Sequence, residues 1–144
     1  MQTPFVYHHK VRWVDTDASG IIHFTAAFRF TEAAETEWFR AAGVPFPGLM
    51  SEHALTIPRV HVEADFRSAL RFDDALAIAV VPGRLGRSSL ALRFEVRREA
   101  DAPEEPPAVS VAIVLVCTDG RLHAARPWPD EVRARLIAAG ATQA

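Results

Sequence analysis

The stretch that organises the chain is residues 11–43, with Asp15-Thr16-Asp17-Ala18-Ser19-Gly20-Ile21-Ile22-His23-Phe24 near its centre. Ser19 and Gly20 form a turn signal between a strand-like segment and a helix-like segment. A carboxylate placed shortly before a helix lies near backbone N–H groups that the helix itself does not use. Such a place suits acyl chemistry, in which negative charge develops on an oxygen.

The flanking segments have different periodicities. Apolar and polar residues alternate over residues 5–16, which predicts a half-buried strand ending at the Asp15-Thr16-Asp17 turn. Apolar residues spaced by threes and fours then predict a helix over residues 25–42. Gly43 can cap its C-terminus, and two prolines follow closely.

The rest of the chain predicts one antiparallel sheet. A short helical turn is expected at residues 51–54, followed by strands at 57–66, 75–85, 89–99 and 108–118. The Asp119-Gly120 turn predicts a short returning strand at 121–126, and residues 130–139 have helical spacing. Strands joined by short connections pair antiparallel. The prediction is an α+β fold with one long helix covering one face of a sheet.

Composition narrows the class of protein. The chain has 144 residues, which predicts a single domain over 1–144, and 49% apolar and 24% charged residues, typical of a soluble globular protein. Its formal charge of -2 gives no electrostatic footprint for nucleic acid or an anionic membrane. Cys117 is the only cysteine, and its apolar strand predicts a buried thiol. Without a signal peptide or spanning segment, a cytoplasmic location is expected.

The order of elements and several motifs resemble the hotdog-fold acyl-CoA thioesterases, closest to the 4-hydroxybenzoyl-CoA thioesterase family. The resemblance covers nearly the whole chain. It is carried by VRWVDTDASGII at 11–22, FRFTEAA at 28–34, EADF at 63–66, FDDAL at 72–76 and GRSSL at 86–90. It implies an antiparallel sheet of five to six strands wrapped around one long central helix, with a short C-terminal helix. It also implies hydrolysis of a thioester to a free acid and coenzyme A.

The resemblance assigns the chemistry to Asp17, which either attacks the thioester carbonyl or activates a water. Thioester hydrolysis needs such a group beside the carbon and a donor at the oxygen, and a helix N-terminus supplies the donor. By position, the leading donor is the backbone N–H of Phe24. The alternative for Asp17 is an ordinary turn or capping residue. Asp15 either shares a face with Asp17 or makes a structural hydrogen bond to the turn.

The same resemblance suggests residues that bind substrate. His23 is a candidate polar group near the thioester, and Glu32 falls where the family often has an acidic residue facing the acyl pocket. Arg87 and Ser88 lie in a hairpin that often meets the coenzyme's phosphates, and a guanidinium suits phosphate. Further arginines that the sequence does not rank are Arg59, Arg67, Arg71 and Arg126. No metal site and no cofactor are expected, since coenzyme A is part of the substrate.

One departure from the family leaves alternatives open. The familiar Asn-Tyr pair is replaced by Ala26-Ala27, which removes side chains that would orient substrate or water. The rival hypotheses are a non-catalytic acyl-CoA binding protein and a hydrolase acting on acyl carrier protein thioesters. Members of the family usually form dimers whose sheets join edge to edge, and many of these dimers pair again. The resemblance therefore predicts a homodimer or homotetramer.

Overall fold

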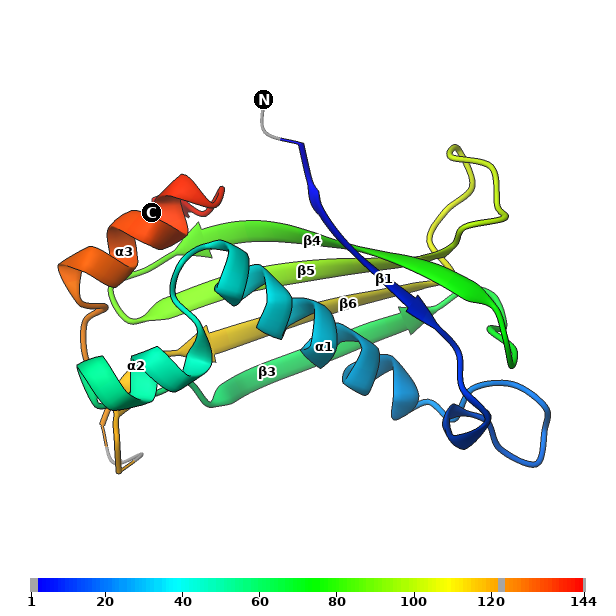
Figure 1. Ribbon diagram of the computed structural model, residues 1–144, viewed down its shortest axis with the longest axis horizontal. Coiled ribbons are helices and arrows are strands. Elements are labelled where there is room, and N and C mark those ends of the chain that lie inside the picture. Colours follow the sequence, from blue (N-terminus) through cyan, green and yellow to red (C-terminus); the bar gives the residue numbers. More distant parts are fainter. Residues whose placement is uncertain (1–2, 122–123, 144) are drawn as a thin grey trace.

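A computed structural model describes residues 3–121 and 124–143 as one sheet with three α-helices packed around it (Figure 1). The helices are α1 (Ala26–Ala41), α2 (Phe46–His53) and α3 (Asp130–Ala138), and a 3-10 helix, η1, covers Trp13–Asp15. The strands are β1 (Phe5–Lys10), β2 (Leu55–Thr56), β3 (Arg59–Phe66), β4 (Ala75–Leu85), β5 (Ser89–Arg98), β6 (Val109–Val116), β7 (Thr118–Asp119) and β8 (Thr142–Gln143).

The main sheet has six strands, five of them in the order β1-β4-β5-β6-β3. Neighbours in that order pair antiparallel, as the short connections predict. The sixth strand, β8, pairs parallel with the end of β4. β2 and β7 form a separate two-stranded sheet.

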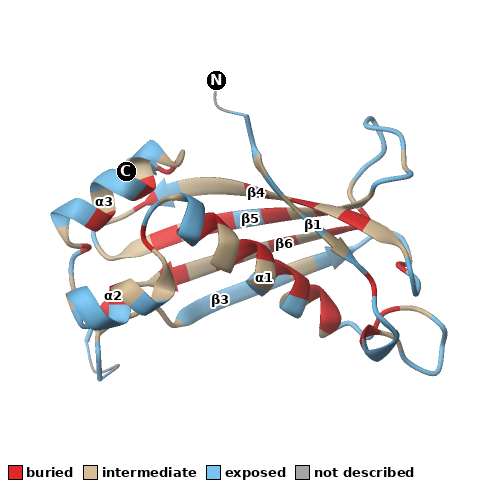
Figure 2. Ribbon diagram, viewed as in Figure 1, coloured by how far each residue is buried: buried red, intermediate tan, exposed pale blue. Residues whose placement is uncertain are grey.

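The long helix α1 lies across one face of this sheet (Figure 1). Its buried side chains include Ala26, Ala27 and Ala34, whose small size lets the helix approach the strands closely, and the larger Phe30 and Trp38. Burial alternates residue by residue along β6, as expected for a strand with one face on the core. The core therefore sits between α1 and the inner face of the sheet (Figure 2).

β3 differs from the other long strands because it is the edge of the sheet and is exposed along nearly its whole length (Figure 2). Its apolar side chains Val60, Val62 and Phe66 are 61%, 45% and 48% exposed. An edge strand presents unpaired backbone groups and is a template for pairing with another chain.

Most predicted elements are confirmed. The helix predicted at 25–42 is α1, its C-terminus is followed by Gly43 at φ 84°, and the helix predicted at 130–139 is α3. The four long strands, β3 to β6, lie within about two residues of their predicted bounds, and the Cys117 thiol is buried. Helix α2 is longer than the predicted turn at 51–54. The predicted strand 121–126 lies partly outside the described residues.

The prediction of one strand over residues 5–16 is wrong beyond Lys10. After Val11, whose N–H donates to the carbonyl of Asp74 at 2.9 Å, the chain turns into η1. Trp13 is 75% exposed instead of lying on a buried face. The cause is Asp15, which accepts a hydrogen bond from the Arg12 N–H at 2.8 Å and so closes a turn.

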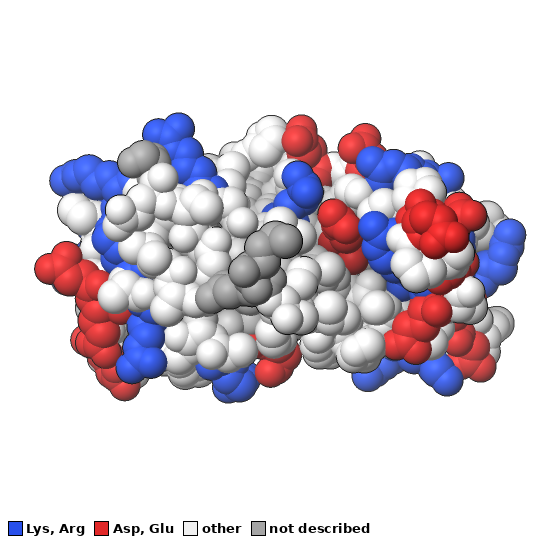
Figure 3. Space-filling view, turned by 90° about the horizontal axis from the view of Figure 1, so that it is seen from above, with Lys and Arg blue, Asp and Glu red and all other residues white. Residues whose placement is uncertain are grey.

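The surface carries both signs of charge. On the face shown in Figure 3, acidic and basic side chains lie interspersed toward the two ends, with largely uncharged surface between them. This face therefore has no continuous basic surface of the kind that binds nucleic acid. Within residues 3–121 and 124–143, no helix is both long and apolar enough to cross a bilayer.

Candidate active site

The predicted Asp17 turn is a tight loop that precedes α1. An isolated bridge pairs Thr16 with Ile22, and the Asp17 N–H donates to the carbonyl of Ile21 at 3.0 Å. Gly20 has φ 85°, a left-handed conformation that a glycine adopts without steric cost. The loop thus returns the chain to the start of the helix and leaves Asp17 at the surface.

The Asp17 carboxylate uses only one of its oxygens within this turn. Oδ1 accepts the Ser19 N–H at 2.8 Å and also the Ser19 hydroxyl. Oδ2 has no hydrogen-bond partner among the residues that the structure describes. The Ser19 hydroxyl, then the Ser19 N–H, hold the pKa of Asp17 below its ordinary value of 3.8, and the charge of His23 acts in the same direction. At neutral pH Asp17 is ionised, with one oxygen open to solvent.

The N-terminus of α1 provides backbone donors. Its N-cap, Thr25, makes no side-chain capping bond, and the Phe24 carbonyl accepts the Ala27 N–H at 3.3 Å. The Phe24 N–H has no partner within the described ranges, and the Phe24 side chain is 60% exposed. A free N–H at the positive end of a helix is suited to stabilise an oxyanion.

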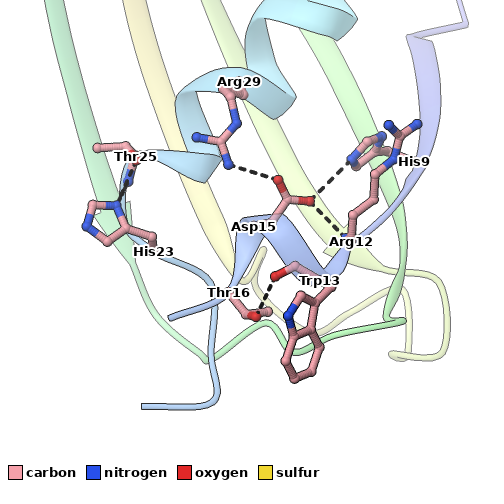
Figure 4. A network of polar contacts seen from close by, with 8 residues as sticks. All are labelled: His9, Arg12, Trp13, Asp15, Thr16, His23, Thr25 and Arg29. Atoms are coloured by element: carbon pink, nitrogen blue, oxygen red, sulfur yellow. Dashed lines mark hydrogen bonds and ion pairs between the residues drawn. The ribbon is translucent and has the colours of Figure 1, made fainter. Parts of the chain in front are cut away.

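His23 links the turn to the helix. Its backbone N–H donates to the Asp15 carbonyl at 2.8 Å, and its Nδ1 lies 2.7 Å from the Thr25 hydroxyl (Figure 4). The Thr25 N–H also points at this nitrogen, at 3.3 Å. His23 is exposed and near enough to Asp17 to lower that residue's pKa. The structure therefore brings the predicted Asp17 and His23 together.

Asp15 is structural, which confirms the second of the two sequence-based interpretations. Its side chain is buried and accepts hydrogen bonds from the Arg12 N–H and from the Arg29 guanidinium, both at 2.8 Å (Figure 4). The imidazole of His9 lies 4.0 Å from the same carboxylate. Burial lowers the pKa of His9, and the charge of Asp15 opposes this shift. The network ties β1, η1 and α1 together beneath the Asp17 turn.

Glu32 lines a pocket of about 390 Å³ between α1 and the outer strands. Its other lining residues are Phe28, Thr31, Glu35, Arg59, Val62 and Ile113. Glu32 itself is exposed. The expected contact of Glu32 with an acyl group stays a prediction.

Sequence reasoning missed Glu35, one turn further along α1. Its side chain is fully buried, and Arg59 of β3 forms an ion pair with its Oε1. Burial lowers the pKa of Arg59, and the charge of Glu32 opposes that shift. A glutamate in a helix is usually exposed, so only the position of β3 beside α1 reveals that Glu35 is buried.

The predicted phosphate-binding residues Arg87 and Ser88 lie far from Asp17 of the same chain. They occupy the β4–β5 turn, near α3, whereas the Asp17 turn lies at the other end of the sheet (Figure 1). β4 alone separates the two ends by roughly 30 Å, at about 3.3 Å per residue. The Arg87 carbonyl accepts the Trp128 N–H at 3.1 Å. One chain therefore does not combine Arg87 and Ser88 with Asp17.

Ala26 and Ala27, which replace the family's Asn-Tyr pair, are fully buried. Their methyl groups pack in the core and do not face the solvent near Asp17. No group of three or more His, Cys, Asp or Glu side chains suited to holding a metal ion occurs in residues 3–121 and 124–143.

Comparison with known proteins agrees with this fold. A profile of the thioesterase-like superfamily matches residues 11–136. The chain is 28% identical over 129 residues to a 1,4-dihydroxy-2-naphthoyl-CoA hydrolase of Nostoc punctiforme, covering 89% of this chain and 83% of that one. It is 36% identical over 96 residues to an enzyme of the same name from Prochlorococcus marinus (strain MIT 9303), covering 62% of this chain and 64% of that one.

Solved structures share the fold. The crystal structure of a putative thioesterase from Prochlorococcus marinus str. MIT 9313 superposes with a TM-score of 0.80 at 29% identity, covering 94% of this chain and 96% of that one. The relatives named in the sequence comparison act on a naphthoyl thioester, so the narrower resemblance to 4-hydroxybenzoyl-CoA thioesterases gives way to a broader family. The chain belongs to the thioesterase-like superfamily and is a thioester hydrolase of the hotdog fold.

Proposed function

We propose that the protein is an acyl-CoA thioesterase in which Asp17 performs the chemistry. The observation that carries the proposal is the Asp17 carboxylate, ionised and with Oδ2 unbonded among the described residues, in the turn that leads into α1. The curated relatives named above are hydrolases of an acyl-CoA. The arrangement supplies both groups that thioester hydrolysis needs, a carboxylate and a backbone donor.

In the reaction, Oδ2 of Asp17 attacks the thioester carbonyl carbon, and the carbonyl oxygen gains negative charge. The Phe24 N–H donates a hydrogen bond to that oxygen. Collapse of the intermediate breaks the C–S bond, releases coenzyme A as the thiolate and leaves an acyl-Asp17 anhydride. Water then hydrolyses the anhydride and restores the carboxylate. In the alternative role Asp17 removes a proton from the attacking water.

The lowered pKa of Asp17 keeps its carboxylate ionised, which both roles require. Hydroxylamine added during turnover traps an acyl anhydride as a hydroxamate. Hydroxamate formed by the parent protein in excess of that formed by the thioester and hydroxylamine with Asp17→Asn supports the nucleophile, and turnover without such an excess supports the base.

We infer that the acyl group is aromatic and hydroxylated. The named relatives act on 1,4-dihydroxy-2-naphthoyl-CoA, and the pocket of about 390 Å³ beside α1 is largely apolar, with acidic groups at its edge. The test is release of free coenzyme A from aromatic and aliphatic acyl-CoA thioesters, and from the same acyl groups on acyl carrier protein. Faster release from aromatic acyl-CoA supports the proposal. Binding without release, or faster release from the carrier protein, contradicts it.

We also propose that the working form is at least a homodimer joined through β3. The support is the exposed edge of β3 and its exposed valines, Val60 and Val62. Because one chain does not bring Arg87 and Ser88 to Asp17, a contact of these residues with the substrate would have to come from a second subunit. Sedimentation equilibrium tests it, since a monomer at assay concentrations would contradict it.

A further inference from the structure

Among the described residues, Glu35 is the one buried carboxylate that the proposed chemistry does not use and that keeps an oxygen, Oε2, without a hydrogen-bond donor. Its side chain is fully buried, and the Arg59 guanidinium pairs with the other oxygen, Oε1. A buried carboxylate without donors costs free energy that is recovered when a donor arrives. Glu35 is therefore prepared to accept a hydrogen bond.

The surroundings of Glu35 show where a donor would come from. Phe28, Thr31 and Glu35 follow one another on one face of α1, and this face lines the pocket of about 390 Å³. Across the pocket lie Val62 of β3 and Ile113 of β6. The pocket is therefore a slot with apolar walls and one buried acceptor, the arrangement by which a site orients a small ligand.

The slot extends along α1 away from the Phe24 amide. A helix rises about 1.5 Å per residue, so Glu35 lies roughly 10 Å beyond Phe28 along the axis, and Phe28 itself is about one turn beyond Phe24. An acyl group whose carbonyl is held by the Phe24 N–H and whose rings follow this face of the helix points its far end at Glu35. Arg59 pairs with Oε1, so Oε2, which has no donor in the described part of the chain, is the oxygen left for a hydroxyl group in the slot.

The charge of the slot selects the kind of donor. Glu35 is already balanced by the Arg59 guanidinium, so a second cation would place excess positive charge in a buried site. A neutral hydroxyl group adds a donor without adding charge, and a hydrogen bond from it to a carboxylate is stronger than one between neutral groups. An aromatic ring carrying that hydroxyl also matches the apolar walls.

We propose that Glu35, held by Arg59, is the specificity-determining residue that recognises a hydroxyl on the distal end of an aromatic acyl group. The inference rests on the proposed thioesterase function and names a feature of its substrate. It assigns Glu35 a contact with the acyl group and Arg59 a positioning role, separate from the bond cleavage at Asp17.

The test compares matched thioesters that differ only in the hydroxyl, namely 4-hydroxybenzoyl-CoA with benzoyl-CoA and 6-hydroxy-2-naphthoyl-CoA with 2-naphthoyl-CoA. For the parent protein, kcat/KM is expected to be higher for the hydroxylated member of at least one pair by about tenfold or more, because a site built around a buried acceptor rejects the analogue that leaves it unpaired. Equal kcat/KM within both pairs overturns the proposal.

Two variants of one position sharpen the comparison. Glu35→Met removes the acceptor and keeps an unbranched side chain, and it is expected to bring the ratio of kcat/KM close to one by slowing only the hydroxylated substrate. Glu35→Gln keeps a weaker neutral acceptor and is expected to give an intermediate ratio. The matched control is Glu37→Gln on the same helix, whose partner is Arg40 and which does not line the slot. This control should retain the parent ratio.

Other outcomes are decisive as well. If Glu35→Met slows both members of each pair equally, or if it dissociates an oligomer that the parent forms, Glu35 is structural and the proposal is wrong. If the parent releases no coenzyme A from any thioester, the proposed function fails by itself. In that case, calorimetric binding of the same four thioesters to the parent and to Glu35→Met decides the present inference. The parent is expected to bind the hydroxylated member of at least one pair about tenfold more tightly than the unhydroxylated one, and Glu35→Met is expected to bind both alike.

Discussion

The Arg29 guanidinium, one turn into α1, donates a hydrogen bond at 2.8 Å to the buried carboxylate of Asp15, fourteen residues earlier in the chain (Figure 4). This contact fixes the start of the helix relative to the 3-10 turn η1. Because the Asp17 turn lies between the two residues, the contact also fixes the frame in which Asp17 is held.

Asp15→Asn is expected to destabilise the fold by about 1–3 kcal/mol, because the buried amide can no longer accept from both the Arg12 N–H and Arg29. The measurement is urea unfolding of the parent and the variant. Glu37→Gln, which removes an exposed pair with Arg40, is the control and should cost less than about 1 kcal/mol. An Asp15→Asn protein as stable as the parent would show that the network carries no stability.

The partly buried imidazole of His9 should make the stability of the fold depend on pH. Its pKa in the fold lies below the ordinary value of 6.5, mainly because of burial, so the unfolded chain binds the proton more readily than the fold does. The stability from neutral His9 is complete above pH 6.5 and is lost as the pH falls from 6.5 through the lower pKa of the fold. Thermal unfolding from pH 7.5 to 5 should show this loss. His9→Gln should show a flatter profile, and an unchanged profile would argue against His9.

The sequence predicted the parts of the fold that local patterns determine. Burial alternates along β5 as its large apolar residues alternate with small or charged ones. Gly43, at φ 84°, follows the C-terminus of α1, as its position before two prolines predicts. The strand predicted through Asp15 failed because the Asp15 side chain closes a turn with the Arg12 N–H and is held there by Arg29, a residue far along the sequence. Alternation alone does not reveal such a partner.

The same distinction between local patterns and long-range contacts applies to the candidate site. Asp17, His23 and the Phe24 amide are close in sequence, so one motif was enough to group them. Glu35 and Arg59 meet only because β3 pairs with β6 and thereby lies beside α1. The separation of Arg87 and Ser88 from Asp17 likewise depends on which end of the sheet each turn occupies. A local sequence pattern does not predict that position.

Ser19→Ala removes the strongest of the three interactions that lower the pKa of Asp17 and keeps the Ser19 backbone hydrogen bond and the charge of His23. The pKa of Asp17 should rise toward its ordinary value of 3.8, and the acidic limb of the kcat/KM profile should move to higher pH. At pH 7 the carboxylate stays ionised, so kcat/KM should change little. The control is Ser51→Ala in α2, and an acidic limb that does not move in Ser19→Ala would show that Asp17 does not set it.

The central claim is that the Asp17 carboxylate cleaves the thioester, and the most direct measurement is steady-state release of coenzyme A by Asp17→Asn. The amide preserves the size of the side chain and the acceptor for Ser19 but is neither a carboxylate nucleophile nor a base. We predict a fall in kcat of about a hundredfold or more, with KM within a few fold of the parent. Hydrolysis of the best thioester at the parent rate by Asp17→Asn would contradict the account.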